Sequence, residues 1–242
     1  MKQKALLLSF GAAFLAVLLA CSMLFRTIEG VFVTETPTSI EDARSPVIIL
    51  DAGHGGEDGG ATGTNGVLEK DLNLSMTRGL AALLRLSGYT VVETRTKDKL
   101  LYPEGTKKGH KKQGDLAGRL AFTEEYPNSI FVSVHMNTFP NQSCEGVQVW
   151  YSQNNEASKD LAEAVRTEVT RSLQPSNHRK TKAATSNIYL LRHAKTPAIL
   201  IECGFLSTPA ECERLCDPLY RMQLAAVFFA AISEKTPLSS CK

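Results

Sequence analysis

The sequence has little cysteine, little net charge and no internal repeat, and the first two scarcities each exclude a class of protein. Six cysteines among 242 residues are too few for a scaffold held together by disulfides. The formal net charge is only +2. A nucleic-acid-binding protein of this composition would need a strong local patch of basic residues, so we expect no nucleic-acid partner.

The rest of the composition is that of an ordinary globular protein. Hydrophobic residues make up 43% of the chain and charged residues 21%, which makes disorder, collagen and coiled coil poor descriptions. The length accommodates one domain of good size or two small ones. The first 26 residues carry three basic residues and no acidic one, so the remainder holds 24 basic against 25 acidic residues and is nearly neutral.

The N-terminus carries a long apolar run. Residues 5–25 are apolar with four interruptions, basic residues precede them, and Arg26 ends the run. A helix of this length can span a bilayer, and the pattern is also typical of an export signal. We therefore predict a signal peptide or N-terminal membrane anchor over residues 1–26. The segment ending at Cys21 loosely resembles a lipoprotein processing box, so cleavage, retention and lipidation all stay open.

The charge pattern around this segment and the composition after it predict the layout of the chain. Basic residues before the apolar run favour an N-terminus in the cytoplasm, with the rest of the chain exported. Residues 27–45 are polar and lack periodicity, as in a linker. We predict one folded domain over residues 46–236 and a short tail over residues 237–242.

Apolar runs and helical stripes alternate along the domain. We predict helices from Glu69 to Ser87, from Leu116 to Glu125, from Ala157 to Leu173 and over residues 208–234, the last split at Pro218, with polar loops over residues 97–114 and 174–187. We predict strands over residues 47–51, 89–94, 129–135, 147–151, 188–191 and 198–202. Such alternation indicates an α/β fold: one twisted, mostly parallel (mixed) sheet of about six strands flanked by helices.

Ligands of such folds lie beyond the carboxyl ends of the strands, which directs attention to the residues there. His54 follows the first strand, His135 ends the third, and Glu202 closes the last. A buried carboxylate is costly unless it is paired or bound to a metal. Glu69 opens the first helix after a glycine-rich loop, where an acid also simply suits the helix dipole.

Taken singly, each of these residues has an ordinary structural explanation; together they suggest a metal site. Two imidazoles and a carboxylate with an open fourth position form a catalytic zinc site. A further carboxylate that does not bind the metal can take a proton from the attacking water. The four residues do not follow the HExxH helix pattern, so the ligands would come from separate elements assembled by the sheet.

Four motifs carry a family resemblance. The stretches ILDAGHGGEDGGA, GVLEKDLNL, SVHMN and PAILIECGFLS occur in that order, and with them the chain resembles the zinc-dependent N-acetylmuramoyl-L-alanine amidases of the type-3 class from about Val47 to Ser233. The resemblance implies one Zn²⁺ per domain. It implies that His54, Glu69 and His135 are the zinc ligands and that Glu202 is the catalytic residue.

The resemblance also implies a substrate and a setting. The reaction would be hydrolysis of the amide between N-acetylmuramic acid and the L-alanine of the stem peptide in peptidoglycan. The compact, anchored form is most similar to the germination-specific amidases of the spore cortex, whose action allows muramic-δ-lactam to form. The domain would then act at the outer face of the cytoplasmic membrane, or in the cell wall or cortex space of a bacterium. Control from outside the domain, including by a protein activator, is a further expectation.

Two rival hypotheses remain at this point. A zinc peptidase would cut within the stem peptide instead of beside the sugar. A non-catalytic peptidoglycan-binding protein would need no intact site, and the presence of all four site residues argues against it.

Several other residues have open roles in the sequence. Asn137 could orient a ligand, contact substrate or cap its strand. Cys203 adjoins Glu202 and should face the opposite side of the sheet, in the core. Arg95 and Arg119 could hold substrate or pair with a buried acid. A disulfide between cysteines 212 and 216, four apart on a helix, is as plausible as free thiols.

Overall fold

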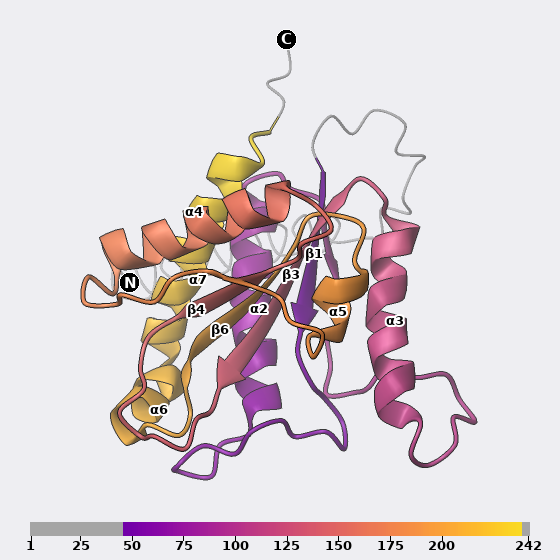
Figure 1. Cartoon of the computed structure of the whole chain (residues 1–242), viewed down its shortest axis with the longest axis horizontal. Coiled ribbons are helices and arrows are strands. Elements are labelled where there is room, and N and C mark those ends of the chain that lie inside the picture. The colour runs from indigo at the N-terminus through magenta and orange to yellow at the C-terminus, as the bar shows by residue number, and fades with distance from the viewer. Residues whose placement is uncertain (1–45, 239–242) are drawn as a thin grey trace, which may run out of the picture. The chain divides into compact units, whose positions relative to one another are not determined.

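A computed structural model of the chain describes residues 46–238 (Figure 1). The predicted export segment 1–26 and the predicted linker 27–45 lie outside the described residues, as do the last four residues of the predicted tail. The described part holds the whole of the predicted domain.

Six strands form one mixed sheet in the order β2-β1-β3-β6-β4-β5. β1, β2, β3 and β6 are parallel, whereas β4 runs antiparallel to β6 and carries β5 as its parallel edge neighbour. The predicted fold class is therefore confirmed. The strand bounds are Val47–Ala52 (β1), Val91–Glu93 (β2), Ser129–Asn137 (β3), Gln148–Tyr151 (β4), Lys182–Ala183 (β5) and Ala198–Phe205 (β6).

Helices cover both faces of this sheet (Figure 1). Helices α2, α4 and α7 pack with the larger hydrophobic cluster on one face, and α3 and α5 lie on the other. The helix bounds are Glu69–Leu86 (α2), Lys111–Glu125 (α3), Ala157–Ser172 (α4), Tyr189–His193 (α5), Pro209–Cys216 (α6) and Pro218–Lys235 (α7).

Strand alternation divides each central strand between the two faces. Ile48 and Leu50 of β1 belong to the cluster beneath α2, whereas Val47 and Ile49 face α3 and α5. On that second face the apolar residues give way to polar ones toward the carboxyl end of the strands, since Asp51 lies there as well. The polar end of this face is where the candidate site is found.

One predicted strand is wrong. Residues 188–191 belong to the start of helix α5, where the Arg192 N–H donates to the Ile188 carbonyl at 3.0 Å. A four-residue apolar run does not distinguish helix from strand by its period. Its burial is real, because Leu190 and Leu191 pack on the sheet face. The sixth strand is instead β5, a strand of 2 residues that lies within the predicted polar loop 174–187.

Other boundaries differ by a few residues. Helix α3 begins at Lys111, inside the predicted loop 97–114, and strands β3 and β6 run past His135 and Glu202. The predicted break at Pro218 is confirmed: the Asp217 side chain accepts from the Leu219 N–H at 2.9 Å and caps α7. Among the described helices none alone is long and apolar enough to cross a membrane, and the α6–α7 pair that reaches this length together bends by 83°.

Candidate metal centre

Three residues from three separate elements converge at the carboxyl end of the sheet. One donor atom from each of His54, Glu69 and His135 lies within 4.8 Å of the others. Glu69 lies between the two imidazoles: its Oε2 is 3.3 Å from His54 Nε2 and its Oε1 is 2.9 Å from His135 Nδ1. The two rings meet edge to face, with centroids 4.9 Å apart.

The loop after β1 presents His54 in an unusual backbone conformation. His54 has φ +62° and is the only non-glycine residue among residues 46–238 with a positive φ. This backbone conformation costs a residue with a side chain about 1–2 kcal/mol. Gly53 packs directly against the other imidazole, since a Cβ at this position would lie 2.2 Å from the His135 ring. The close approach of the loop to β3 therefore requires glycine.

Asp58 orients the imidazole of His54. Its Oδ2 is 2.8 Å from His54 Nδ1, which leaves Nε2 facing Glu69. Burial opposes a charged imidazole, but the hydrogen bonds to Glu69 and Asp58 outweigh it and raise the pKa of His54 to about 9 in the metal-free protein. A carboxylate on the far nitrogen of a ligating histidine is the usual outer partner in metal sites.

Glu69 is fixed as the first residue of α2. Its Oε2 accepts from the Ala61 N–H at 2.8 Å, and its Oε1 accepts from the Met136 N–H at 3.1 Å and from the Asn73 side chain at 3.3 Å. Burial disfavours the carboxylate, yet the hydrogen bonds with His135 and His54 hold the pKa of Glu69 well below its usual range. The side chain is therefore an anion in place to bind a cation.

Glu202 faces the same site from β6. It is the register partner of His135 across the β3–β6 pair, so both side chains lie on one face of the sheet. Its buried Oε2 has no hydrogen-bond partner among residues 46–238. Burial raises the pKa of Glu202 to about 7. A half-buried carboxyl with a raised pKa, in the same cleft as His54 and His135, is a candidate functional group.

The donor set fits a metal that takes nitrogen and oxygen ligands with an open position. Two imidazoles and one carboxylate are the protein ligands of one common type of catalytic zinc site. Asp58 supplies the outer partner of one imidazole, and Glu202 stands beside the ligands outside the group of three. The structure thus brings together all four residues that the sequence singled out.

A cleft of about 250 Å³ opens beside these residues. One wall comes from α3, which contributes the buried Arg119 and the exposed Lys112, and the other comes from the segment around Tyr189. The cleft is lined by Asp51, Gly53, His54, Asp58, Lys112, Asp115, Leu116, Arg119, His135, Asn187, Ile188, Tyr189, Leu190, Leu200 and Glu202. Substrate reaching the ligands would pass between these walls.

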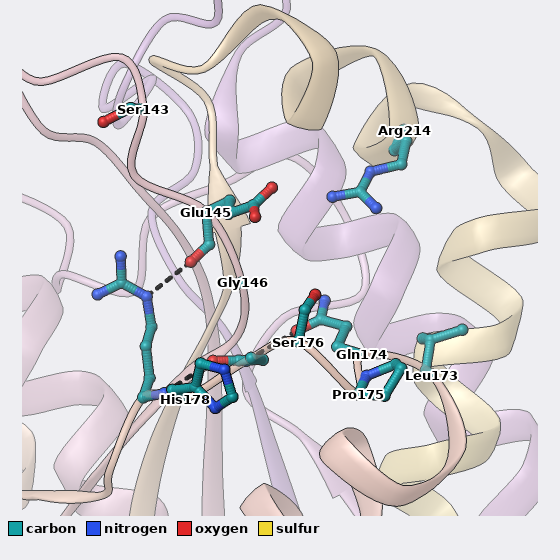
Figure 2. A pocket seen from close by; sticks show the side chains of 11 residues that line it. Ser143, Glu145, Gly146, Leu173, Gln174, Pro175, Ser176, His178 and Arg214 are labelled. Atoms are coloured by element: carbon teal, nitrogen blue, oxygen red, sulfur yellow. Dashed lines mark hydrogen bonds between the residues drawn. The ribbon is translucent and has the colours of Figure 1, made fainter.

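A second cavity, of about 370 Å³, contains none of the four site residues. Figure 2 shows its lining side chains, among them Glu145, His178 and Arg214, gathered from the loops next to β4 and from α6. The Arg179 Nε donates to the Glu145 carbonyl at 2.7 Å, and the guanidinium lies over the Phe205 ring. This cavity offers no cluster of metal ligands.

The structure places several residues whose roles were open. At the end of β3 the Asn137 Oδ1 accepts from the Thr138 N–H at 2.8 Å, as in a strand cap. Cys203 is fully buried in the core, as predicted. Arg119 pairs with two buried acids, at 2.6 Å from Asp51 Oδ1 and 2.8 Å from Asp115 Oδ2. The described cysteines, which include both members of the suggested α6 pair, are free.

Two residues near the candidate metal ligands were not predicted. Asp58 follows His54 by four residues inside the first motif. This spacing within a glycine-rich loop is the sequence feature that could have indicated contact between the two side chains. Asn73 follows Glu69 by one helical turn, and its Nδ2 also donates to the Gly53 carbonyl at 3.1 Å. That contact joins α2 to the loop that carries His54.

Comparison with known proteins identifies the family. The profile of the N-acetylmuramoyl-L-alanine amidase family matches residues 48–234. The germination-specific N-acetylmuramoyl-L-alanine amidase of Bacillus subtilis is 35% identical over 187 residues, which cover 77% of this chain and 78% of that protein.

Solved structures agree with this family. The CwlD amidase of Clostridioides difficile, determined in complex with the GerS lipoprotein, has 36% identity and a TM-score of 0.75, over 78% of this chain and 98% of that one. The amidase AmiC2 of Nostoc punctiforme has 30% identity and a TM-score of 0.67, over 78% and 96% of the two chains.

The chain belongs to the N-acetylmuramoyl-L-alanine amidase family, a family of metal-dependent enzymes that act on peptidoglycan. The predicted enzyme class is confirmed, in preference to a stem-peptide peptidase or a non-catalytic binding protein. The reaction is hydrolysis of the amide between N-acetylmuramic acid and L-alanine.

Proposed function

We propose that this amidase depends on zinc, that His54, Glu69 and His135 hold the metal, and that Glu202 transfers the proton. The observation that carries the proposal is the convergence of three donor atoms within 4.8 Å, with the buried Oε2 of Glu202 unpartnered beside them. Nitrogen and carboxylate donors with an open position suit zinc better than calcium or magnesium, which prefer oxygen ligands alone.

The residues of the chain then have separate tasks. Zinc, when bound, acts as a Lewis acid that polarises the amide carbonyl and acidifies the attacking water. Glu202 accepts the proton of that water and returns it to the nitrogen of the departing L-alanine. In the metal-free protein burial raises the pKa of Glu202, and a carboxyl held in a partly desolvated site is suited to exchange a proton in this way. Asp58 keeps Nε2 of His54 directed at the metal by accepting from the opposite nitrogen.

The test is metal content together with product identity. The purified domain should contain one zinc per chain, lose activity on chelation and regain it with added zinc. Mass spectrometry of digested muropeptides should show glycan freed of whole stem peptides. A folded domain that binds no zinc and cleaves at the same rate after chelation would refute the proposal.

We further propose that the domain is exported and acts on spore-cortex peptidoglycan. Support comes from the apolar segment 5–25 and from the name of the Bacillus subtilis relative, a germination-specific amidase. In this proposal residues 1–26 are the signal or anchor, 27–45 the linker, 46–236 the catalytic domain and 237–242 the tail. A deletion strain that kept normal muramic-δ-lactam in its cortex would contradict the cortex role.

A protein activator is the last part of the proposal. The Clostridioides difficile relative was solved with a lipoprotein bound, which supports control of this amidase by a partner outside the domain. The expected result is that the purified domain alone cleaves muropeptides slowly and that a partner protein raises the rate. Full activity of the isolated domain would remove this expectation.

A further inference from the structure

Arg95 is a buried cation whose hydrogen bonds go to backbone carbonyls. The residue is 1% exposed. Its Nε donates to the Ala52 carbonyl at 2.8 Å, and its Nη1 donates to the Lys97 carbonyl at 3.3 Å. Its Nη2 donates to two further carbonyls, those of Gly53 and Lys70, each at 2.9 Å. The guanidinium therefore joins three segments of chain.

No carboxylate in the described part of the chain forms an ion pair with Arg95. Arg119, its neighbour, is also buried but has Asp51 and Asp115 as direct partners. Burial lowers the pKa of Arg95, so the charge is held at a cost. Asp51, Asp98 and Asp115 favour the charge without a direct ion pair. A buried charge without a direct ion-pair partner is unfavourable in a protein interior, and its presence calls for a role that a neutral side chain would not fill.

The carbonyls that Arg95 binds adjoin two of the metal ligands. Gly53 immediately precedes His54, and Lys70 immediately follows Glu69. One nitrogen, Nη2, bridges these two carbonyls, so the loop after β1 and the first turn of α2 are held at a fixed separation. The positive φ of His54 is a second reason for a contact at this place, because an unfavourable backbone conformation persists only where surrounding contacts enforce it.

We propose that Arg95 is a positioning residue that sets the separation of His54 and Glu69 and thereby the zinc affinity of the site. This inference rests on the proposed metal ligands. Arg95 itself has no lone pair to offer a cation, so its influence passes through the backbone of its two neighbours. Its fork of donors matters, since a lysine in the same place cannot bridge the same carbonyls with fixed geometry.

The experiment measures zinc affinity by competition with a chromophoric chelator. Arg95→Met should weaken zinc binding by about 10- to 100-fold, the effect typical of losing an outer partner of a metal ligand. Arg95→Lys should fall between wild type and Arg95→Met. The matched control is Arg78→Met, because the exposed Arg78 guanidinium donates to the Thr96 carbonyl of the same loop at 2.6 Å without reaching either ligand segment. Its zinc affinity should stay within about twofold of wild type on that physical ground.

A second measurement separates positioning from a merely structural role. Unfolding by urea is followed with and without saturating zinc for each variant. Tenfold weaker zinc binding corresponds to about 1.4 kcal/mol less stabilisation by zinc in excess. The proposal would be overturned if a variant lost the same free energy of unfolding with zinc as without it and kept the zinc affinity of wild type. If Arg95→Met does not fold, Arg95→Lys decides, and wild-type zinc affinity in that variant has the same consequence.

Failure of the proposed zinc site would look different. In that case wild type itself would bind no zinc, or His54→Ala would bind it as tightly as wild type. Wild-type binding that is lost in His54→Ala but kept in Arg95→Met would reject only the role of Arg95.

Discussion

Replacing Glu202 with glutamine should abolish most of the activity while making the metal-free domain more stable. The glutamine has nearly the same shape, and within the described part of the chain the Oε2 that it replaces has no hydrogen-bond partner to lose. Glu202 also lies outside the group of three proposed metal ligands, so zinc content should not change. Loss of a positioned proton-transfer group lowers kcat by about 10²- to 10⁴-fold, or about 2.7–5.5 kcal/mol of activation free energy.

The stability effect follows from the direction of the pKa shift. Burial raises the pKa of Glu202 from 4.5 to about 7 in the folded protein. A carboxyl with a raised pKa destabilises the fold as pH rises above its unfolded value, and the full penalty is present above the folded value. A shift of this size corresponds to roughly 3 kcal/mol, so the variant should be more stable by an amount of that order at pH 8.

The assays are muropeptide cleavage followed by mass spectrometry, zinc content of the loaded protein, and urea unfolding of the metal-free domain at pH 5 and pH 8. The control is Glu211→Gln, a buried glutamate whose carboxylate accepts from the Gly146 and Phe205 N–H groups at 2.8 Å each. Burial raises the pKa of Glu211 as well, but both of its oxygens accept from backbone N–H groups, so the glutamine NH2 would face a donor. The gain in stability at pH 8 should therefore be smaller for Glu211→Gln than for Glu202→Gln. Wild-type kcat in Glu202→Gln, or a loss of stability at pH 8, would refute the reasoning.

Four further outcomes are expected. Asp58→Asn should weaken zinc binding by about tenfold, because it removes the anionic partner of His54 Nδ1; chelator competition checks this. Zinc must displace a proton from the same imidazole, whose pKa is raised to about 9, so zinc affinity should rise with pH up to about 9 and then level off; a flat profile from pH 7 to pH 9 would contradict the shift. The raised pKa also means that this imidazole stabilises the metal-free domain fully below its unfolded value of 6.5 and loses that contribution as pH rises through about 9; unfolding midpoints across this range test it. Arg119→Met should lower the free energy of unfolding by about 3–5 kcal/mol, because the fully buried Asp51 keeps its charge without its direct partner. A decrease below about 1 kcal/mol in urea unfolding would contradict this expectation.

Much of the fold was predictable because burial leaves a periodic pattern. The strand at Val47 and the last strand are continuous apolar runs, which a sheet covered on both faces requires. The break at Pro218 was predictable because proline cannot continue a helix. The run at residues 188–191 was not, because burial against the sheet face made a short helix as apolar as a strand.

The site divides in a similar way. Residue types and motif order identified His54, Glu69, His135 and Glu202 as the residues to examine. The sequence was silent on which atoms meet, because the donors come from the loop after β1, from α2 and from β3. Their approach depends on strand register and on a glycine that admits the His135 ring. Register is a relation between two strands, and strands buried on both faces, such as β1, give a continuous apolar run that does not reveal it.

By itself the sequence determined the fold class, the family and the four candidate site residues, because each depends on the kind and order of residues. Only the tertiary structure decided how these residues are held. Asp58 orients His54, and Arg95 bridges the carbonyls of Gly53 and Lys70, because these segments pack together in the folded domain. The same packing leaves the Oε2 of Glu202 without a hydrogen-bond partner among residues 46–238. The physical reason is that hydrogen-bond partners and burial, which set the charge and direction of each group, are fixed by packing between distant segments.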